Sequence, residues 1–143
     1  MIIRFEEDLD LPVEHVYGIF RTPADWPRLY GAFGEVKDRG GGWVAVPLRG
    51  FPFPLVAKIT HDEPLRRVCW IFRGFWRGTG EVRFAERPNG VRIEGFEEIA
   101  IRPLGVLSPV VERLLLERRF RGIWASGWRR LRRHALCERG GGR

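Results

Sequence analysis

One long helix at the end of the chain limits the possible folds more than any other segment. It is expected from Ser108 to about Cys137, because Ser108 followed by Pro109 is typical of a helix start. At about 100° per residue, its apolar side chains fall on one face and most of its arginines on the other. The rest of the chain must cover that apolar face. The apolar face holds Phe120, Ile123, Trp124, Trp128, Leu131 and Ala135, and the opposite face holds Arg119, Arg129, Arg130 and Arg133.

The same segment carries the whole net charge of the protein. Residues 1–104 contain 15 Lys or Arg and 15 Asp or Glu, whereas residues 105–143 contain 10 Arg and 3 Glu, which gives the net +7. The arginines lie opposite the aromatic side chains and do not alternate with them, as a nucleic-acid stacking platform would require. We therefore expect a solvated arginine face. Binding to nucleic acid or to an anionic membrane surface is the less favoured alternative.

Short strand-like runs fill the chain before this helix. Apolar and polar residues alternate over residues 2–10, which predicts a first strand with Ile3, Phe5, Glu7 and Leu9 on one side. Turn residues separate the later runs by short intervals, which favours antiparallel neighbours over crossover connections. The later strands are expected at about 33–39, 43–49, 53–62, 66–74, 78–86 and 91–101.

Two short helices are expected between the first and second strands. Val13, Val16, Tyr17 and Phe20 recur at helical spacing and give one apolar stripe. A second start follows at residues 22–25, where a Thr cap precedes a Pro at the first helical position. This second helix would carry Trp26, Leu29 and Tyr30.

The last predicted hairpin places a carboxylate on the apolar face of the sheet. A turn at residues 87–90 pairs Gly80 with Glu97 on that face and Arg83 with Glu94 on the charged face. Glu97 would then point inward among glycines, which predicts open space around it. The other pairs on the inner face are Glu86–Val91, Phe84–Ile93, Val82–Gly95 and Gly78–Ile99.

The preceding hairpin allows two registers. A loop at residues 75–77 places Val68, Trp70 and Phe72 on the inner face, and we favour this register because their bulk suits a core. A slip of one residue would place Cys69, Ile71 and Arg73 there instead.

This order of elements resembles the helix-grip fold of the START-like superfamily, which includes polyketide cyclases, pollen-allergen-type proteins and coenzyme Q-binding proteins. Residues 11–20 and Asp25-Trp26-Pro27 resemble the opening helix of the family and its aspartate–aromatic–proline step. The resemblance covers Ile3 to about His134. It implies an α+β fold in which a curved antiparallel sheet of about seven strands wraps around the C-terminal helix, in one domain at 1–138 with a tail at 139–143.

The resemblance also implies a cavity between sheet and helix for lipids, quinones, polyketides or other apolar molecules. Glu97 could orient such a ligand or transfer protons with a pKa raised by burial. It could instead pair with Arg113 or Arg121, which lie four residues either side of Glu117 in a possible Arg–Glu–Arg ladder. The expected ligand-binding residues are Trp70, Phe72, Trp76, Gly80, Val82, Phe84, Ile93, Gly95, Glu97, Arg113, Glu117, Phe120, Arg121 and Trp124.

The leading functional prediction is a binding module for an apolar or amphipathic small molecule. The first alternative is an enzyme of the cyclase/aromatase type with Glu97 as its catalytic residue, and the second is a ribosome- or membrane-associated interaction protein. No cofactor and no metal are expected, since His15, His61 and His134 are scattered and Cys69 and Cys137 lack metal-ligand spacing. We expect a cytoplasmic location, because the N-terminus is acidic and has no hydrophobic signal region.

Overall fold

The computed structural model describes residues 1–30, 34–48, 51, 53–101 and 109–140, with the backbone alone at 28, 30, 101, 109–113 and 134–140. The described strands form one antiparallel sheet of seven strands, in the order β1-β7-β6-β5-β4-β3-β2. The long-range β1–β7 pair brings the first strand against the last, so the β6–β7 hairpin lies beside the N-terminal strand. The strands are β1 Ile2–Leu9, β2 Lys37–Gly40, β3 Trp43–Val46, β4 Leu55–Glu63, β5 Arg67–Arg73, β6 Trp76–Arg87 and β7 Gly90–Ile101.

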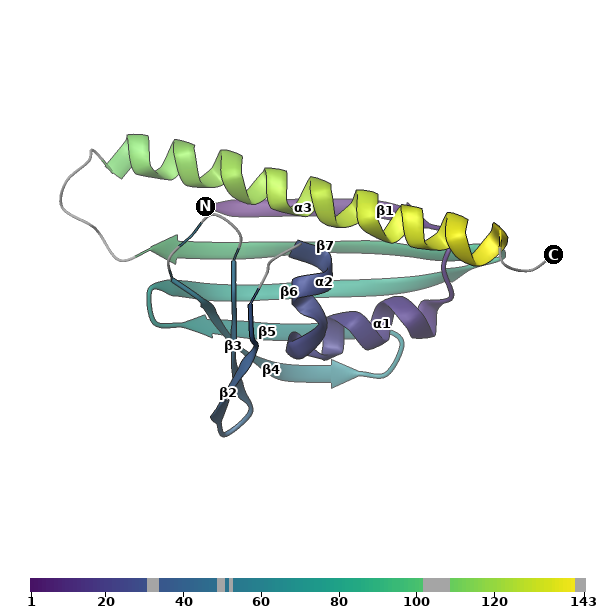
Figure 1. Ribbon diagram of the computed structural model, residues 1–143, viewed down its shortest axis with the longest axis horizontal. Helices are drawn as coiled ribbons and strands as arrows, with labels where there is room; N and C mark the ends of the chain where they lie inside the picture. The colour runs from purple at the N-terminus through teal and green to yellow at the C-terminus, as the bar shows by residue number, and fades with distance from the viewer. Residues whose placement is uncertain (31–33, 49–50, 52, 102–108, 141–143) are drawn as a thin grey trace.

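The helices complete the predicted helix-grip α+β fold, which the structure confirms. Helix α1 spans Val13–Arg21, a 3-10 turn follows at Pro23–Asp25, and α2 spans Trp26–Tyr30. The long helix α3, Pro109–Gly140, runs along β1, while α1 and α2 lie across the sheet (Figure 1). Because α2 also contacts α3, the interior is enclosed by sheet, short helices and long helix.

Thr22 occupies the N-terminal cap position of the 3-10 turn, as expected, but its side chain makes no capping hydrogen bond there. Its carbonyl oxygen instead accepts a hydrogen bond from the backbone N–H of Asp25 at 2.8 Å. The turn is therefore closed by the backbone and by the preset φ of Pro23.

The register predicted for the β6–β7 hairpin is confirmed at every pair. Gly80 faces Glu97 on the inner side, and Arg83 faces Glu94 on the outer side. The register works because a one-residue slip would turn every apolar side chain to solvent.

The predicted β5–β6 loop at residues 75–77 is wrong. Strand β5 ends at Arg73, and Trp76 already belongs to β6, where it faces Ile101 and is fully buried. Gly74 makes the earlier turn possible, since its φ of 93° suits glycine. The favoured register of this hairpin is nevertheless confirmed, because Val68 and Trp70 are buried and Trp70 faces Gly80. The alternative register, slipped by one residue, is excluded.

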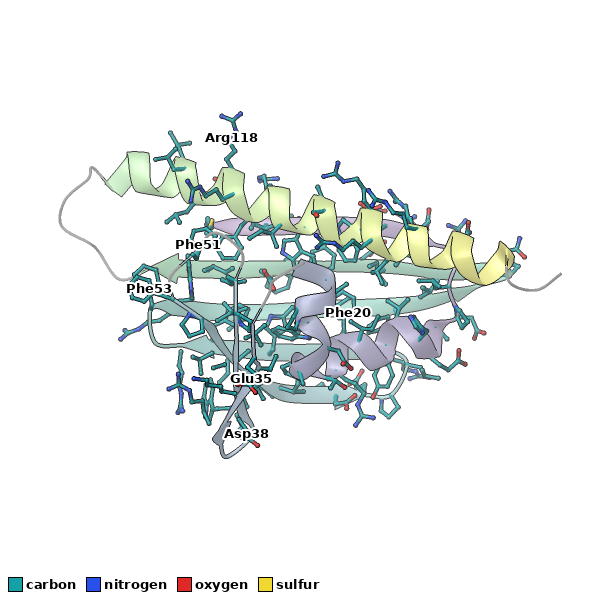
Figure 2. All side chains as sticks on the ribbon, viewed as in Figure 1. Phe20, Glu35, Asp38, Phe51, Phe53 and Arg118 are labelled. Atoms are coloured by element: carbon teal, nitrogen blue, oxygen red, sulfur yellow. The ribbon has the colours of Figure 1, made fainter. Side chains whose placement is uncertain are left out.

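The arginine face of α3 points to solvent, as Arg118 illustrates in Figure 2. Arg130 departs from this pattern: it is half-buried, and its Nη1 donates to the carbonyl oxygen of Leu29 in α2 at 3.2 Å. Within the described ranges, no helix has the length and apolar character needed to cross a membrane.

Candidate functional site

Glu97 lies in the interior between the sheet and α3. It belongs to β7, faces Gly80 of β6 and Ile3 of β1, and is 1% exposed, the one charged residue among those described that is buried. Its Oε2 accepts a hydrogen bond from the indole N–H of Trp124 in α3 at 3.0 Å. Its Oε1 has no hydrogen-bond partner within the described part of the chain. The sequence therefore placed the carboxylate correctly, but its partner is an indole and not an arginine.

The glycines around Glu97 make room for other groups, so the expectation of open space above them is wrong. A Cβ on Gly80 would lie 2.1 Å from Nε1 of Trp70, and one on Gly95 would lie 2.5 Å from the Phe5 ring. A Cβ on Gly78 would meet the backbone carbonyl of Glu98. Two of the three glycines therefore accommodate aromatic rings from neighbouring strands.

Burial sets the ionisation of Glu97. It raises the pKa of this carboxyl from 4.5 to about 7, because the charged form loses its hydration. The indole N–H of Trp124, which donates to Oε2, acts in the opposite direction by favouring the carboxylate, and so does that of Trp70, which lies nearby without a hydrogen bond of normal length and angle. Near neutral pH the two protonation states therefore coexist.

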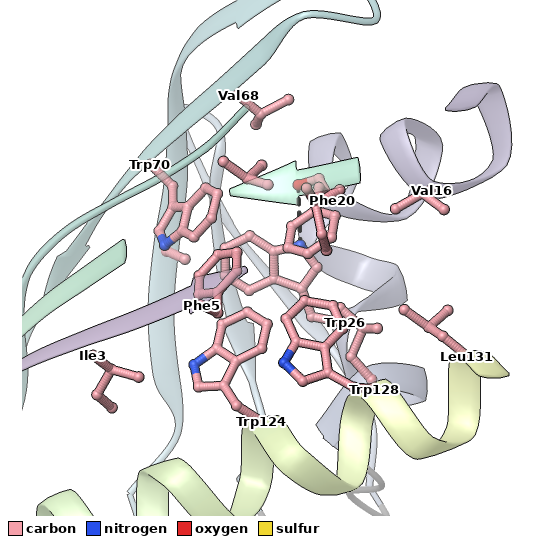
Figure 3. Packing of buried hydrophobic residues seen from close by; sticks show 14 of the residues in the cluster. Ile3, Phe5, Val16, Phe20, Trp26, Val68, Trp70, Trp124, Trp128 and Leu131 are labelled. Atoms are coloured by element: carbon pink, nitrogen blue, oxygen red, sulfur yellow. Dashed lines mark hydrogen bonds between the residues drawn. The ribbon is translucent and has the colours of Figure 1, made fainter. Parts of the chain in front are cut away.

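Stacked aromatic rings, including the Trp124 ring that donates to Glu97, fill this part of the interior, and Figure 3 shows their packing. The Phe5 ring lies 4.8 Å from the Trp124 ring, which in turn lies 5.1 Å from that of Trp128. On the other side, Trp70 packs edge-on against Trp26 at 5.3 Å. These rings supply contact area for a flat or apolar molecule and also fill much of the core.

The structure divides the predicted aromatic set between two clusters. Trp70 and Trp124 lie at Glu97. Trp76 and Phe120 instead pack on each other at 5.0 Å and on Phe51, in a second cluster. Phe72 contacts Trp26 edge-on, and the remaining predicted apolar positions, Val82, Phe84 and Ile93, are buried.

Two arginines were predicted as partners of Glu97, and the one whose side chain the structure describes, Arg121, pairs with Glu117 instead. Arg121 is exposed and donates through Nη2 to Glu117 at 2.8 Å, which confirms that half of the ladder. The pair lies at the solvent edge of α3, because the inward direction is taken by Trp124. The side chain of Arg113 lies outside the described residues.

A groove of about 490 Å³ runs along the seam between β1 and α3 and opens to solvent. Phe5, Trp124 and Trp128 line it together with charged side chains that include Arg121. Ile3, the strand neighbour of Glu97, lines it too. The groove therefore reaches the two residues that flank the buried carboxylate, on the strand side and on the helix side.

Three residues of this site were absent from the expected ligand-binding set: Ile3, Phe5 and Trp128. Their signals were present, since Ile3 and Phe5 alternate inward in the first strand and Trp128 shares the helix face of Trp124. Only the pairing of β1 with β7 brings them to Glu97. Among the described residues, no three His, Cys, Asp or Glu side chains form a metal-binding group.

Comparisons with known proteins establish the fold and nothing finer. No family profile and no curated protein matches the sequence. A conserved protein from Geobacillus kaustophilus has a TM-score of 0.73 at 8% identity, over 95% of each chain. The Aha1 dimer from Colwellia psychrerythraea has a TM-score of 0.63 at 13% identity, over 92% of this chain and 93% of that one. A Deinococcus radiodurans protein gives 0.62 at 18% identity, over 93% and 95%.

Proposed function

We propose that this chain is a START-like binding protein for a small apolar or amphipathic molecule, held beside Glu97 between the sheet and α3. The observation that carries the proposal is the carboxylate itself, which is buried among aromatic rings with Oε1 unpaired within the described chain.

An unpaired buried polar atom is unfavourable by about 1–3 kcal/mol, and by more when it is charged. Glu97 is buried at the centre of the fold, whereas every other described charged residue is at least partly exposed. A ligand whose polar end meets Oε1 would remove this penalty, and the surrounding rings would contact its apolar body. The residue is then kept for binding and not for stability.

The groove between β1 and α3 offers the route to this position. Its volume of about 490 Å³ falls within the range of about 300–1,000 Å³ that is common for small-molecule sites. Trp124 lines the groove and also donates to Glu97, so a rotation of this indole would connect the two. Trp124 is therefore proposed as the gate.

The test is a titration with N-phenyl-1-naphthylamine, a neutral apolar probe whose fluorescence can be excited through nearby tryptophans. We expect saturable binding and a 1:1 complex in native mass spectrometry. Ala125→Phe narrows the groove and should weaken binding several-fold, whereas Gly122→Phe, on the helix surface outside the groove lining, should not. Absence of saturable binding, or equal effects of the two variants, would reject the proposal.

A second candidate, a cyclase-type enzyme, draws support from the pKa of Glu97. A carboxyl with a pKa of about 7 suits general acid or base catalysis at neutral pH. In that case Glu97→Gln would keep ligand affinity and lose turnover by about 10²–10⁴-fold. Cytoplasmic location stays a prediction of the sequence.

A further inference from the structure

Two buried polar atoms of opposite hydrogen-bonding character lie together in the interior. Oε1 of Glu97 and Nε1 of Trp70 both lack a hydrogen-bond partner within the described chain. They are neighbours because the Trp70 indole lies over Gly80, and Gly80 is the strand partner of Glu97. Both residues are 1% exposed, so bulk water cannot form the hydrogen bonds that these two atoms lack.

The chemistry of the two atoms restricts the group that could join them. An indole N–H only donates, so the missing group must accept from Trp70. The ionised form of Glu97 only accepts, so the same group must donate to Oε1. A hydroxyl does both. An ammonium cannot accept from Trp70, a carboxylate would repel ionised Glu97, and a carbonyl could bond to both groups only when Glu97 is protonated.

A hydroxyl also suits the protonated carboxyl, since its oxygen can accept from both the acid and the indole. A hydroxyl therefore satisfies the pair in either protonation state. The rings around Trp70 favour a flat body for the rest of the molecule. Phe20 stacks against Trp70 at 6.2 Å with an interplanar angle of 24°, and Trp26 lies edge-on at 5.3 Å.

We propose that the molecule bound in this interior is a neutral phenol or alcohol whose hydroxyl donates to Glu97 and accepts from the Trp70 indole. This inference rests on the proposed function, because it names the chemical class of the ligand at the same position. Trp124 keeps its own bond to Oε2, so the hydroxyl joins an existing hydrogen-bonded pair.

The experiment compares 2-naphthol with 2-methylnaphthalene, which differ by a hydroxyl in place of a methyl group of similar size. Isothermal titration calorimetry should give 2-naphthol about tenfold tighter binding to the wild-type protein. Trp70→Phe and Glu97→Leu should each abolish most of that preference while leaving the affinity for 2-methylnaphthalene nearly unchanged. Glu98→Leu, at the adjacent exposed position of the same strand, should keep it.

The possible outcomes separate this inference from the proposed function. Equal affinity of the two compounds would overturn the hydroxyl assignment and leave apolar binding intact. If neither compound binds, both the hydroxyl assignment and the proposed binding function are rejected. If Glu97→Leu does not fold, Trp70→Phe decides alone, since it keeps the carboxylate and an aromatic ring but removes the indole donor. Binding of 2-naphthaldehyde as tight as that of 2-naphthol above neutral pH would contradict the inference, because a carbonyl can accept from Trp70 but leaves ionised Glu97 without a donor.

Discussion

The position of Glu97 follows from the arrangement of a few residues around it. The β6–β7 register turns its side chain inward, and Gly80 and Gly95 leave room for the Trp70 and Phe5 rings that seal it from water. A single indole N–H from α3 then satisfies one of its two oxygens. The acidity of the residue is thus controlled by burial more than by any neighbouring charge.

Stability should depend on pH through Glu97. Its pKa is 4.5 when unfolded and about 7 when folded, so the folded state holds the proton more tightly. The stabilising contribution is present in full below the unfolded pKa and is lost as pH rises through the folded pKa, by about 3 kcal/mol in all. Urea denaturation between about pH 5 and about pH 8 should show this loss in the wild type and in Glu98→Gln, but not in Glu97→Gln. A pH slope unchanged in Glu97→Gln would be inconsistent with the raised pKa.

Two glycines should respond oppositely to alanine. In Gly80→Ala the new Cβ would meet the Trp70 indole at 2.1 Å, so the ring must move and the free energy of unfolding should fall by about 1–3 kcal/mol. In Gly122→Ala the Cβ meets nothing within 4 Å on an exposed helix surface, so unfolding should become harder by up to about 1 kcal/mol. Thermal and urea unfolding would measure both, and destabilisation of similar size in both would contradict the packing at Gly80.

Helix α3 is held to the sheet by its aromatic face. Trp128 is 5% exposed and packs on Phe5 at 5.4 Å. The ion pair between Arg132 of α3 and Glu7 of β1 also links the two elements, but the arginine side chain is 51% exposed. Exposed pairs of this kind contribute little, whereas buried indoles contribute much.

We therefore expect Trp128→Ala to lower the free energy of unfolding by about 3–5 kcal/mol and Arg132→Ala to lower it by less than about 1 kcal/mol. Chemical denaturation of the two variants under the same conditions gives the comparison. A larger loss from Arg132→Ala than from Trp128→Ala would mean that charge, and not aromatic packing, attaches the helix.

These elements also show which parts of the fold and of the site can be predicted from the sequence. The β6–β7 register was predictable because one face is apolar, the other carries an Arg–Glu pair, and the turn is clear. The β5–β6 loop was misplaced because Trp76 looked like a loop residue, whereas its burial depends on Phe51 and Phe120, which are distant in sequence. The partner of Glu97 was missed because the position of α3 along the sheet depends on tertiary packing. Helical spacing alone allowed arginine and tryptophan alike.

At the scale of the whole molecule, the charge and the proposed binding site are separate. The exposed face of α3 carries most of the arginines of that helix, while the interior holds one carboxylate among the described residues, together with aromatic rings. A neutral ligand bound in that interior interacts little with the surface field, which dissolved salt screens within about 10 Å at 0.1 M.

Binding of 2-naphthol should accordingly change less than about twofold between about 0.05 M and about 0.5 M NaCl. Short duplex DNA and phosphatidylglycerol vesicles, titrated under the same conditions, test the alternative role of the arginine face. Salt-sensitive binding of 2-naphthol would place it on the arginine surface and not in the interior.

The most direct test of an interior site at Glu97 is a two-dimensional ¹H–¹⁵N spectrum of the six tryptophan indole groups, recorded as 2-naphthol is added. The signals of Trp70 and Trp124, assigned through their Phe variants, should shift together with saturation. The signal of Trp43, which lies on the outlying strand β3 beneath Arg73, should stay in place. Shifts confined to Trp43, or no saturable shift of Trp70 and Trp124, would contradict an interior binding site.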